Sequence, residues 1–177
     1  IVGFEKEYPM TQPTIAVANY FIGKAQEEGV EITPMKLLKL VYIAHGWSYP
    51  AGIGPLIGEE VQAWKFGPVI PSVYHRFKEY GASNITQQAA EWTDDNKLVV
   101  PAITENSPES KLLDSVWHAY KQFNGGQLST LTHKTGSPWQ QTVAARDGVI
   151  SAGMSIPNAI IEQHYRQIAA KRSATAN

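Results

Sequence analysis

The chain has 177 residues, with 15 basic and 16 acidic side chains, a formal net charge of −1 and no cysteine. Because the charges balance, the chain lacks the excess of basic residues that is typical of nucleic-acid-binding proteins, so we expect no direct nucleic-acid binding. The absence of cysteine excludes disulfides, thiolate catalysis and cysteine-ligated zinc. No apolar run is long enough to span a bilayer and no secretory signal is recognisable, which predicts a cytoplasmic protein without a membrane partner.

The folded domain is expected to begin after the first few residues. Met10 resembles a natural start, so residues 1–9 are interpreted as an upstream or vector-derived segment. Residues 10–172 are enough for one domain with a sizeable core, and no linker or internal repeat divides them. Residues 173–177 are expected to form a disordered tail.

Two helices are predicted near the start of this domain. Apolar residues at helical spacing follow Pro13, and Gly29 is a plausible stop for the first helix. Thr33 and Pro34 supply the cap and first-turn residue of a second helix that ends near Trp47. The apolar residues of this second helix cover more than one face, so we expect a central helix that is buried on most sides.

A short strand and a third helix come next. A Gly- and Pro-rich loop leads to alternating residues that predict a strand over Val61–Trp64. The turn Lys65-Phe66-Gly67-Pro68 then connects this strand to a helix that opens at Pro71 and stops at Gly81. Asp94-Asp95-Asn96 predicts a hairpin that joins Glu91–Thr93 to Lys97–Val100.

The second half of the chain is predicted to be helical. The expected helices begin at Ser107-Pro108 and end at Asn124-Gly125-Gly126, cover Leu128–His133, run from Ser137-Pro138 to near Gly148, and run from about Pro157 to Arg172. Helical patterns therefore dominate, and the strands are short and few. The predicted fold class is mostly α (α+β): a single-domain helical bundle with a small inserted β-sheet or hairpin.

No catalytic or metal-binding motif is present. The five histidines do not fall in HExxH, and no GxSxG elbow, phosphate loop or dinucleotide-binding glycine motif occurs. His118 and His164 lie on or beside apolar stripes and are expected to be partly buried structural residues, whereas His75 is expected to face solvent. We therefore expect no catalytic residue, metal or cofactor. An enzyme with an unrecognised site is the alternative of another class.

The segment from Trp64 to Pro71 is the first candidate for a binding surface. Gly67 permits backbone angles that other residues avoid, and the flanking prolines restrict the chain. A rigid turn of this kind can hold Lys65 and Phe66 in place for a partner. The alternative is that the turn only joins a strand to a helix, with Trp64 and Phe66 both packed inside.

The segment from Leu128 to Trp139 is the second candidate. In a structural interpretation, Thr132 and His133 bond to the backbone ends of neighbouring helices and Trp139 anchors the next helix. In the functional alternative, the loop from His133 to Ser137 presents polar groups to a ligand.

Three segments follow one another in a recognisable order. They are Lys39-Leu40-Val41-Tyr42-Ile43-Ala44-His45-Gly46-Trp47, Ala63-Trp64-Lys65-Phe66-Gly67-Pro68-Val69, and Leu131-Thr132-His133 followed by Pro138-Trp139. Together they resemble the Panacea domain, an antitoxin-type domain that is also seen in phage-associated proteins. The resemblance extends from about Thr14 to Tyr165. The chain departs from the family pattern at Gln62, where an acidic residue is usual, and by one extra residue between His133 and Pro138.

This resemblance implies protein binding rather than catalysis. It implies an antitoxin that neutralises a cognate protein toxin by direct contact. The alternative is a phage or prophage accessory protein that binds a host protein, or a proteolytic adaptor with an AAA+ protease as second partner. We expect the partner-binding surface to comprise Trp64, Lys65, Phe66, Gly67, Pro68, Pro71, Tyr74, His133 and Trp139.

Overall fold

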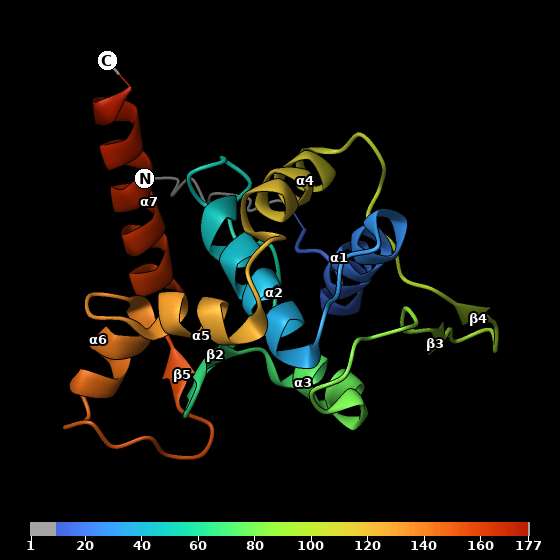
Figure 1. Cartoon of the computed structure of the whole chain (residues 1–177), viewed down its shortest axis with the longest axis horizontal. Helices are drawn as coiled ribbons and strands as arrows, with labels where there is room; N and C mark the ends of the chain where they lie inside the picture. Colours follow the sequence, from blue (N-terminus) through green and yellow to red (C-terminus); the bar gives the residue numbers. More distant parts are fainter. Residues whose placement is uncertain (1–9, 177) are drawn as a thin grey trace, which may run out of the picture.

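The computed structural model describes residues 10–176 of the chain. The expectation for residues 1–9 lies outside this range. Helices dominate the described part and surround a small sheet (Figure 1). The helices are α1 (Thr14–Glu28), α2 (Pro34–Ser48), α3 (Pro71–Phe77) with the 3-10 turn η1 (Lys78–Tyr80), α4 (Pro108–Tyr120), α5 (Gly125–His133), α6 (Pro138–Ala144) and α7 (Asn158–Thr175). The predicted fold class is confirmed.

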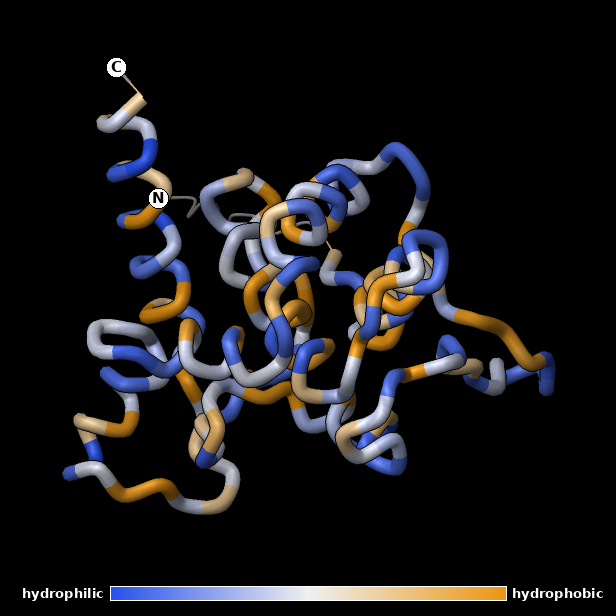
Figure 2. Tube along the Cα trace, viewed as in Figure 1, coloured by the Kyte–Doolittle hydropathy of each residue, from blue (hydrophilic) through white to orange (hydrophobic). Residues whose placement is uncertain are grey.

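Helix α2 is the centre of the fold, as its apolar sequence predicted. It contacts α1, α3, α4, α5 and α7. The Thr33 side chain caps it by accepting from the Lys36 backbone N–H, and Pro34 occupies its first turn. Helix α1 ends at Gly29, whose left-handed conformation (φ 65°) is favourable for glycine. Figure 2 shows hydrophobic stretches along both helices, and most of their apolar side chains are buried in the core.

A three-stranded antiparallel sheet lies at the foot of α2 and α5 (Figure 1). Its strand order is β2 (Gly67–Val69), β1 (Val61–Trp64) and β5 (Ser155–Ile156). Strand β1 was predicted, but β5 was not, because a two-residue strand is too short to show alternation. The predicted hairpin is confirmed as β3 (Glu91–Trp92) paired with β4 (Leu98–Val99). No helix in the described part is long and apolar enough to cross a bilayer.

Several predicted boundaries are wrong. Asn124 does not end α4, which already stops at Tyr120; it caps α5 instead. Its side chain accepts from the Gln127 backbone N–H, and the Gln127 side chain accepts from the Asn124 N–H, both at 2.9 Å. This reciprocal pair satisfies two backbone donors that a helix start leaves free. Helix α6 ends before Gly148, and α7 continues beyond Arg172.

The three histidine predictions have different outcomes. His75 is exposed and His164 is half-buried, as expected. His118 was expected to be partly buried but is exposed, because it lies one position beyond the buried Trp117 on α4. Its ring nitrogen Nδ1 donates to the Asp114 carbonyl at 2.9 Å, one helical turn earlier.

Two apolar segments stand outside the core. The β3–β4 hairpin projects from the body and exposes Trp92 (69%) and Leu98 (57%). The loop before β5 exposes Val149 (63%) and Ile150 (38%). Both segments appear as hydrophobic stretches at the edge of the molecule in Figure 2.

Candidate functional site

The turn between β1 and β2 consists of Lys65 and Phe66. Trp64 pairs with Gly67 across the hairpin, so only two residues lie between the strands. The predicted four-residue turn is therefore too long, because Gly67 and Pro68 belong to β2. Gly67 has φ 109°, where a side chain is strained. A Cβ at this position would also lie only 3.0 Å from the Lys39 Nζ, so both backbone angle and space favour glycine.

Side chains from three helices hold the backbone of this turn. They bond alternate carbonyls along the hairpin, one from each of α6, α5 and α2. The bonds are Trp139 Nε1 to the Trp64 carbonyl at 2.8 Å, Ser129 Oγ to the Phe66 carbonyl at 2.6 Å, and Lys39 Nζ to the Pro68 carbonyl at 2.9 Å. These contacts restrict the turn more than its prolines alone would.

Lys39 is the least expected of these three donors. Its side chain is fully buried, and burial lowers its pKa to about 7. An amine donates a hydrogen bond in both its charged and its neutral form, so the bond to Pro68 does not require the charge. Lys39 thus connects the central helix directly to the strand that follows the turn.

Aromatic rings support the turn from behind. The Trp64 ring packs edge-to-face against Tyr74 of α3, with centroids 4.8 Å apart and an interplanar angle of 67°. Its indole N–H donates to the Gln62 side chain at 2.9 Å. The His133 ring lies 5.2 Å from the Trp139 ring, between centroids. The two candidate segments therefore adjoin one another.

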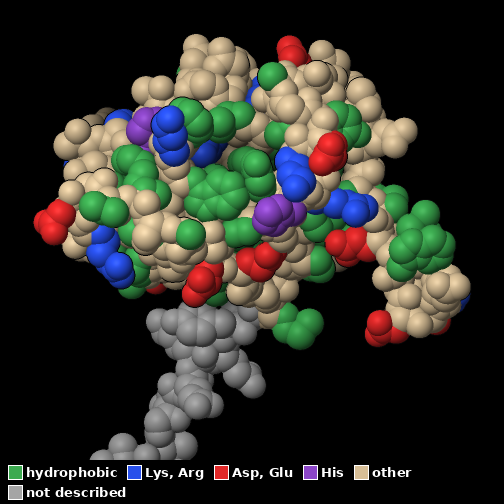
Figure 3. All heavy atoms as spheres, turned by 90° about the horizontal axis from the view of Figure 1, so that it is seen from below, with side chains coloured by type: hydrophobic (Ala, Val, Ile, Leu, Met, Phe, Trp, Pro, Cys, Tyr) green, Lys and Arg blue, Asp and Glu red, His purple; other side chains and the backbone are tan. Residues whose placement is uncertain are grey.

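Only two of the nine predicted residues are exposed, and they form the tip of the turn. Phe66 is 56% exposed, and the Lys65 Nζ lies 5.3 Å from the centre of its ring. The alternative in which Trp64 and Phe66 are both packed inside is wrong for Phe66, whereas Trp64 is half-buried. Gly67 and Pro68 are buried, and the others are half-buried: Pro71, Tyr74, His133 and Trp139. Apolar side chains gather on the face of the molecule shown in Figure 3.

Three contributors to this region were not predicted from the sequence. Ser129 and Lys39 bond the turn, and the loop before β5 lies beside it. A hollow of about 350 Å³ is lined by residues 62–65 on one side and residues 150–153 on the other. The position of Lys39 within an otherwise apolar helix could have indicated that its side chain bonds inside the fold. The apolar pair Val149-Ile150 in a loop flanked by glycines could have indicated the hollow. We use "turn surface" for Lys65, Phe66 and this adjoining hollow.

The interpretation of Thr132 and His133 needs correction. Thr132 does not bond the end of a neighbouring helix; its hydroxyl donates within α5, to the Leu128 carbonyl at 2.9 Å. His133 Nδ1 lies 3.5 Å from the Ser129 Oγ, a pairing that in a hydrolase would suggest a nucleophile and its base. Here the Ser129 hydroxyl donates to the Phe66 carbonyl, so its proton is directed away from the histidine. The Ser129 side chain therefore stabilises the backbone of the turn, with His133 beside it.

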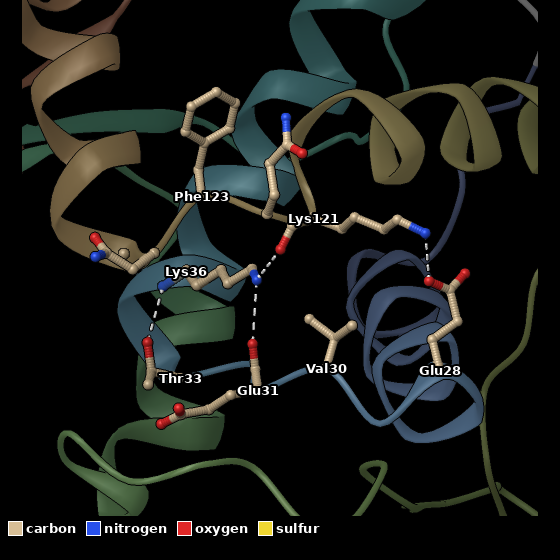
Figure 4. A pocket seen from close by; sticks show the side chains of 10 residues that line it. Glu28, Val30, Glu31, Thr33, Lys36, Lys121 and Phe123 are labelled. Carbon is tan, nitrogen blue, oxygen red and sulfur yellow. Dashed lines mark hydrogen bonds and ion pairs between the residues drawn. The ribbon is translucent and has the colours of Figure 1, made fainter.

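A second hollow of about 620 Å³ lies where the start of α2 meets the α4–α5 connection (Figure 4). The buried Lys36 amine donates to the carbonyls of Glu31 and Lys121. The Lys121 amine in turn pairs with Glu28 at 2.6 Å. Both lysines are therefore engaged within the chain. They fix the start of α2 against α1 and α4, and Lys39 lies one turn further along the same helix.

No metal-binding cluster is found within residues 10–176, where no three His, Asp or Glu side chains converge. The geometry of the described residues fits an exposed binding surface. The Phe66 ring and the Lys65 amine lie at the tip of a turn whose backbone is held by hydrogen bonds from three helices. A rigidly held aromatic side chain at the surface is a common centre of protein–protein contacts.

Sequence comparison places the chain in a family. It matches the family described as antitoxin SocA-like, Panacea domain, over residues 37–140, which is more than half of the chain. The chain therefore belongs to this family, and the resemblance seen in its three motifs is confirmed. The matched range contains α2 from Leu37 onward, the turn residues Lys65 and Phe66, and Trp139.

A curated relative covers nearly the whole chain. The chain is 28% identical to antitoxin SocA of Caulobacter vibrioides (strain NA1000 / CB15N) over 161 residues. This alignment covers 89% of the chain and 85% of the relative. No solved structure matches the chain.

Proposed function

We propose that this protein is an antitoxin that neutralises a cognate protein toxin by direct binding, without catalysis of its own. Its acting unit is the domain of residues 10–172, and its compartment is the cytoplasm. The toxin docks on the turn surface, with Phe66 and Lys65 at the centre of the contact. This centre is supported on the protein side by the half-buried side chains of Trp64, Tyr74, His133 and Trp139.

The observation that carries this proposal is the exposure of Phe66 on a backbone that three helices hold. The Phe66 ring is more than half exposed, and its contact with water is unfavourable. A partner that covers the ring removes this contact and gains binding free energy. Because the turn is already ordered, little conformational entropy is lost on binding. Family membership supports the antitoxin role, and Lys65 adds a charge that can meet an acidic group on the toxin.

The test begins with the product of the neighbouring open reading frame, expressed alone and together with this chain. The proposal expects toxicity alone and rescue on co-expression. Phe66→Ala and Lys65→Glu are then compared for rescue, for toxin affinity and for thermal melting. Truncation of a hot-spot aromatic costs about 2 kcal/mol or more, roughly 30-fold in affinity. Because both side chains are exposed, melting should shift by no more than about 2 °C.

The β3–β4 hairpin offers matched control variants. Lys97→Glu and Leu98→Ala change the same kinds of side chain on another exposed hairpin, where Leu98 is 57% exposed. They should preserve rescue. Full rescue by both turn variants would eliminate the turn surface as the docking site. Lost rescue with a collapsed melting temperature would show instead that Phe66 maintains the fold.

A further inference from the structure

A small cavity lies on the other side of the α5–α6 connection from the turn. It has a volume of about 230 Å³ and lies between α2, α5, the start of α6, and α7. Small-molecule sites usually measure about 300–1,000 Å³. The cavity is therefore better matched to one or two side chains of a protein partner than to a cofactor.

Phenolic side chains form its inner wall. The Tyr42 hydroxyl, on the central helix, is buried beside the Tyr165 side chain, and no acceptor within residues 10–176 takes its O–H in good hydrogen-bond geometry. Tyr165 of α7 lies beside it, with ring centroids 6.1 Å apart. The Tyr165 ring can pack against α2 only because Gly46 lacks a Cβ, which would overlap that ring. A buried O–H donor without an acceptor is costly, and an acceptor that enters the cavity would satisfy it.

The charged groups around the cavity are all basic. Lys134, His164 and Arg172 line it, and no Asp or Glu is among its lining residues. The Arg172 guanidinium lies 4.7 Å from the centre of the Trp47 ring, which holds it over the aromatic wall. Burial and the nearby Lys134 charge both lower the pKa of His164. His164 is therefore mainly neutral at pH 7, and the positive charge beside the aromatic wall comes from Lys134 and Arg172.

We propose that this cavity receives an acidic residue of the toxin together with an adjacent aromatic side chain. The carboxylate lies between Lys134 and Arg172 and accepts from the Tyr42 hydroxyl. The aromatic side chain packs against Trp47 and Tyr165. This inference rests on the proposed antitoxin function, since it takes the occupant to be a segment of the toxin.

The position of the cavity supports a toxin segment as its occupant. The connection between α5 and α6 separates the cavity from the turn surface. Thr132, Lys134, Ser137 and Pro138 line the cavity, whereas Trp139 bonds the Trp64 carbonyl on the turn side. A partner that covers Phe66 can therefore extend across this connection and insert a side chain into the cavity.

Short peptides test the chemistry without the toxin. The probes are the capped dipeptides acetyl-Phe-Glu-amide, acetyl-Phe-Gln-amide and acetyl-Ala-Glu-amide, together with sodium acetate. Binding to the full chain is followed by NMR shifts of the Tyr42, Tyr165 and Trp47 side chains. We expect saturable shifts with Phe-Glu, and roughly tenfold weaker binding of Phe-Gln, which lacks the charge. Equal binding of Phe-Gln, or equal binding of acetate alone, would overturn the proposed occupant.

Variants then separate a binding role from a structural one. Tyr42→Phe keeps the ring and removes the hydroxyl, whose O–H has no acceptor, so it should melt at a similar temperature while Phe-Glu binds several-fold more weakly. The double variant Lys134→Glu/Arg172→Glu should weaken both Phe-Glu and the toxin roughly tenfold. The charge-matched control is Lys78→Glu/Lys111→Glu, which changes exposed lysines that do not line the cavity.

The outcomes distinguish this inference from the proposed function. If the wild-type chain does not bind the toxin, the antitoxin proposal fails, and with it the toxin as occupant, whatever the peptides show. If the chain binds the toxin but the Lys134/Arg172 variant binds it as tightly as wild type, the cavity is not part of the interface. Weaker binding in this variant, with unchanged binding in the control, supports the cavity as a second contact.

Discussion

Replacing Lys39 by methionine should reduce the rise of the unfolding free energy between pH 7 and pH 9 by about 2 kcal/mol. Burial lowers the pKa of Lys39 from its ordinary value of 10.5 to about 7 in the folded chain. Between these two values the unfolded chain binds more protons than the folded one. The unfolding free energy of the wild type should therefore rise with pH, and the buried charge should destabilise the fold most below pH 7.

The size of this effect follows from the two pKa values. Each unit of pKa difference corresponds to about 1.4 kcal/mol, and at pH 7 the buried amine is about half protonated. From pH 7 to pH 9 the stability gained through Lys39 is therefore about 2 kcal/mol. Methionine is similar in length but has no charge, so this contribution disappears. The Pro68 carbonyl loses its donor, which costs roughly 1–3 kcal/mol at every pH.

The assay is urea unfolding of both proteins at pH 7, 8 and 9. Burial also lowers the pKa of Lys36, but that group is present in both proteins and cancels in the difference. Lys111→Met, at an exposed position of α4, is the matched control and should leave the slope unchanged. Parallel pH profiles for wild type and Lys39→Met would refute the reasoning, since they would show that Lys39 keeps its charge when folded.

Three further substitutions test the support of the turn. Gly67→Ala forces a side chain into a backbone with φ 109° and against the Lys39 amine, so it should cost roughly 1–3 kcal/mol, measured as a lower melting temperature. Asn124→Ala breaks the reciprocal cap of α5 and should cost about 1 kcal/mol in urea unfolding, with little effect on toxin affinity measured by calorimetry. Trp139→Phe keeps an aromatic ring but removes the donor to the Trp64 carbonyl and part of the packed ring area, so it should destabilise the fold by roughly 1–3 kcal/mol or more; an unchanged melting curve would show that this bond is dispensable.

Local signals made the helices predictable from the sequence. Thr33, Ser107 and Ser137 each precede a proline, and each side chain accepts a backbone N–H in the first turn of its helix. Such caps need only neighbouring residues, so a sequence displays them directly. Asn124 carries the same chemistry, but the two glycines that follow it favoured a helix end over a helix start. The capping partner Gln127 was the signal that decides between the two.

The candidate site was only partly predictable, because its geometry depends on contacts between distant residues. The three motifs identified Trp64, Phe66 and Trp139, which the fold does bring to one region. The exposure of Phe66 does not follow from alternation, since a two-residue turn interrupts the strand pattern. The burial of Lys39 does not follow from its side chain either, because lysine is almost never fully buried without a partner. Only the packed hairpin supplies that partner, the Pro68 carbonyl.

The connection between α5 and α6 links the two surfaces that we propose for toxin binding. It runs from Lys134 to Ser137. Lys134 from this connection lines the cavity, while Trp139, just after it, holds the turn. A change in its length therefore moves the cavity rim and the turn support together, without altering the core around α2. Such a connection provides a physical route by which one fold can present different binding surfaces, since loops tolerate insertions that packed helices do not.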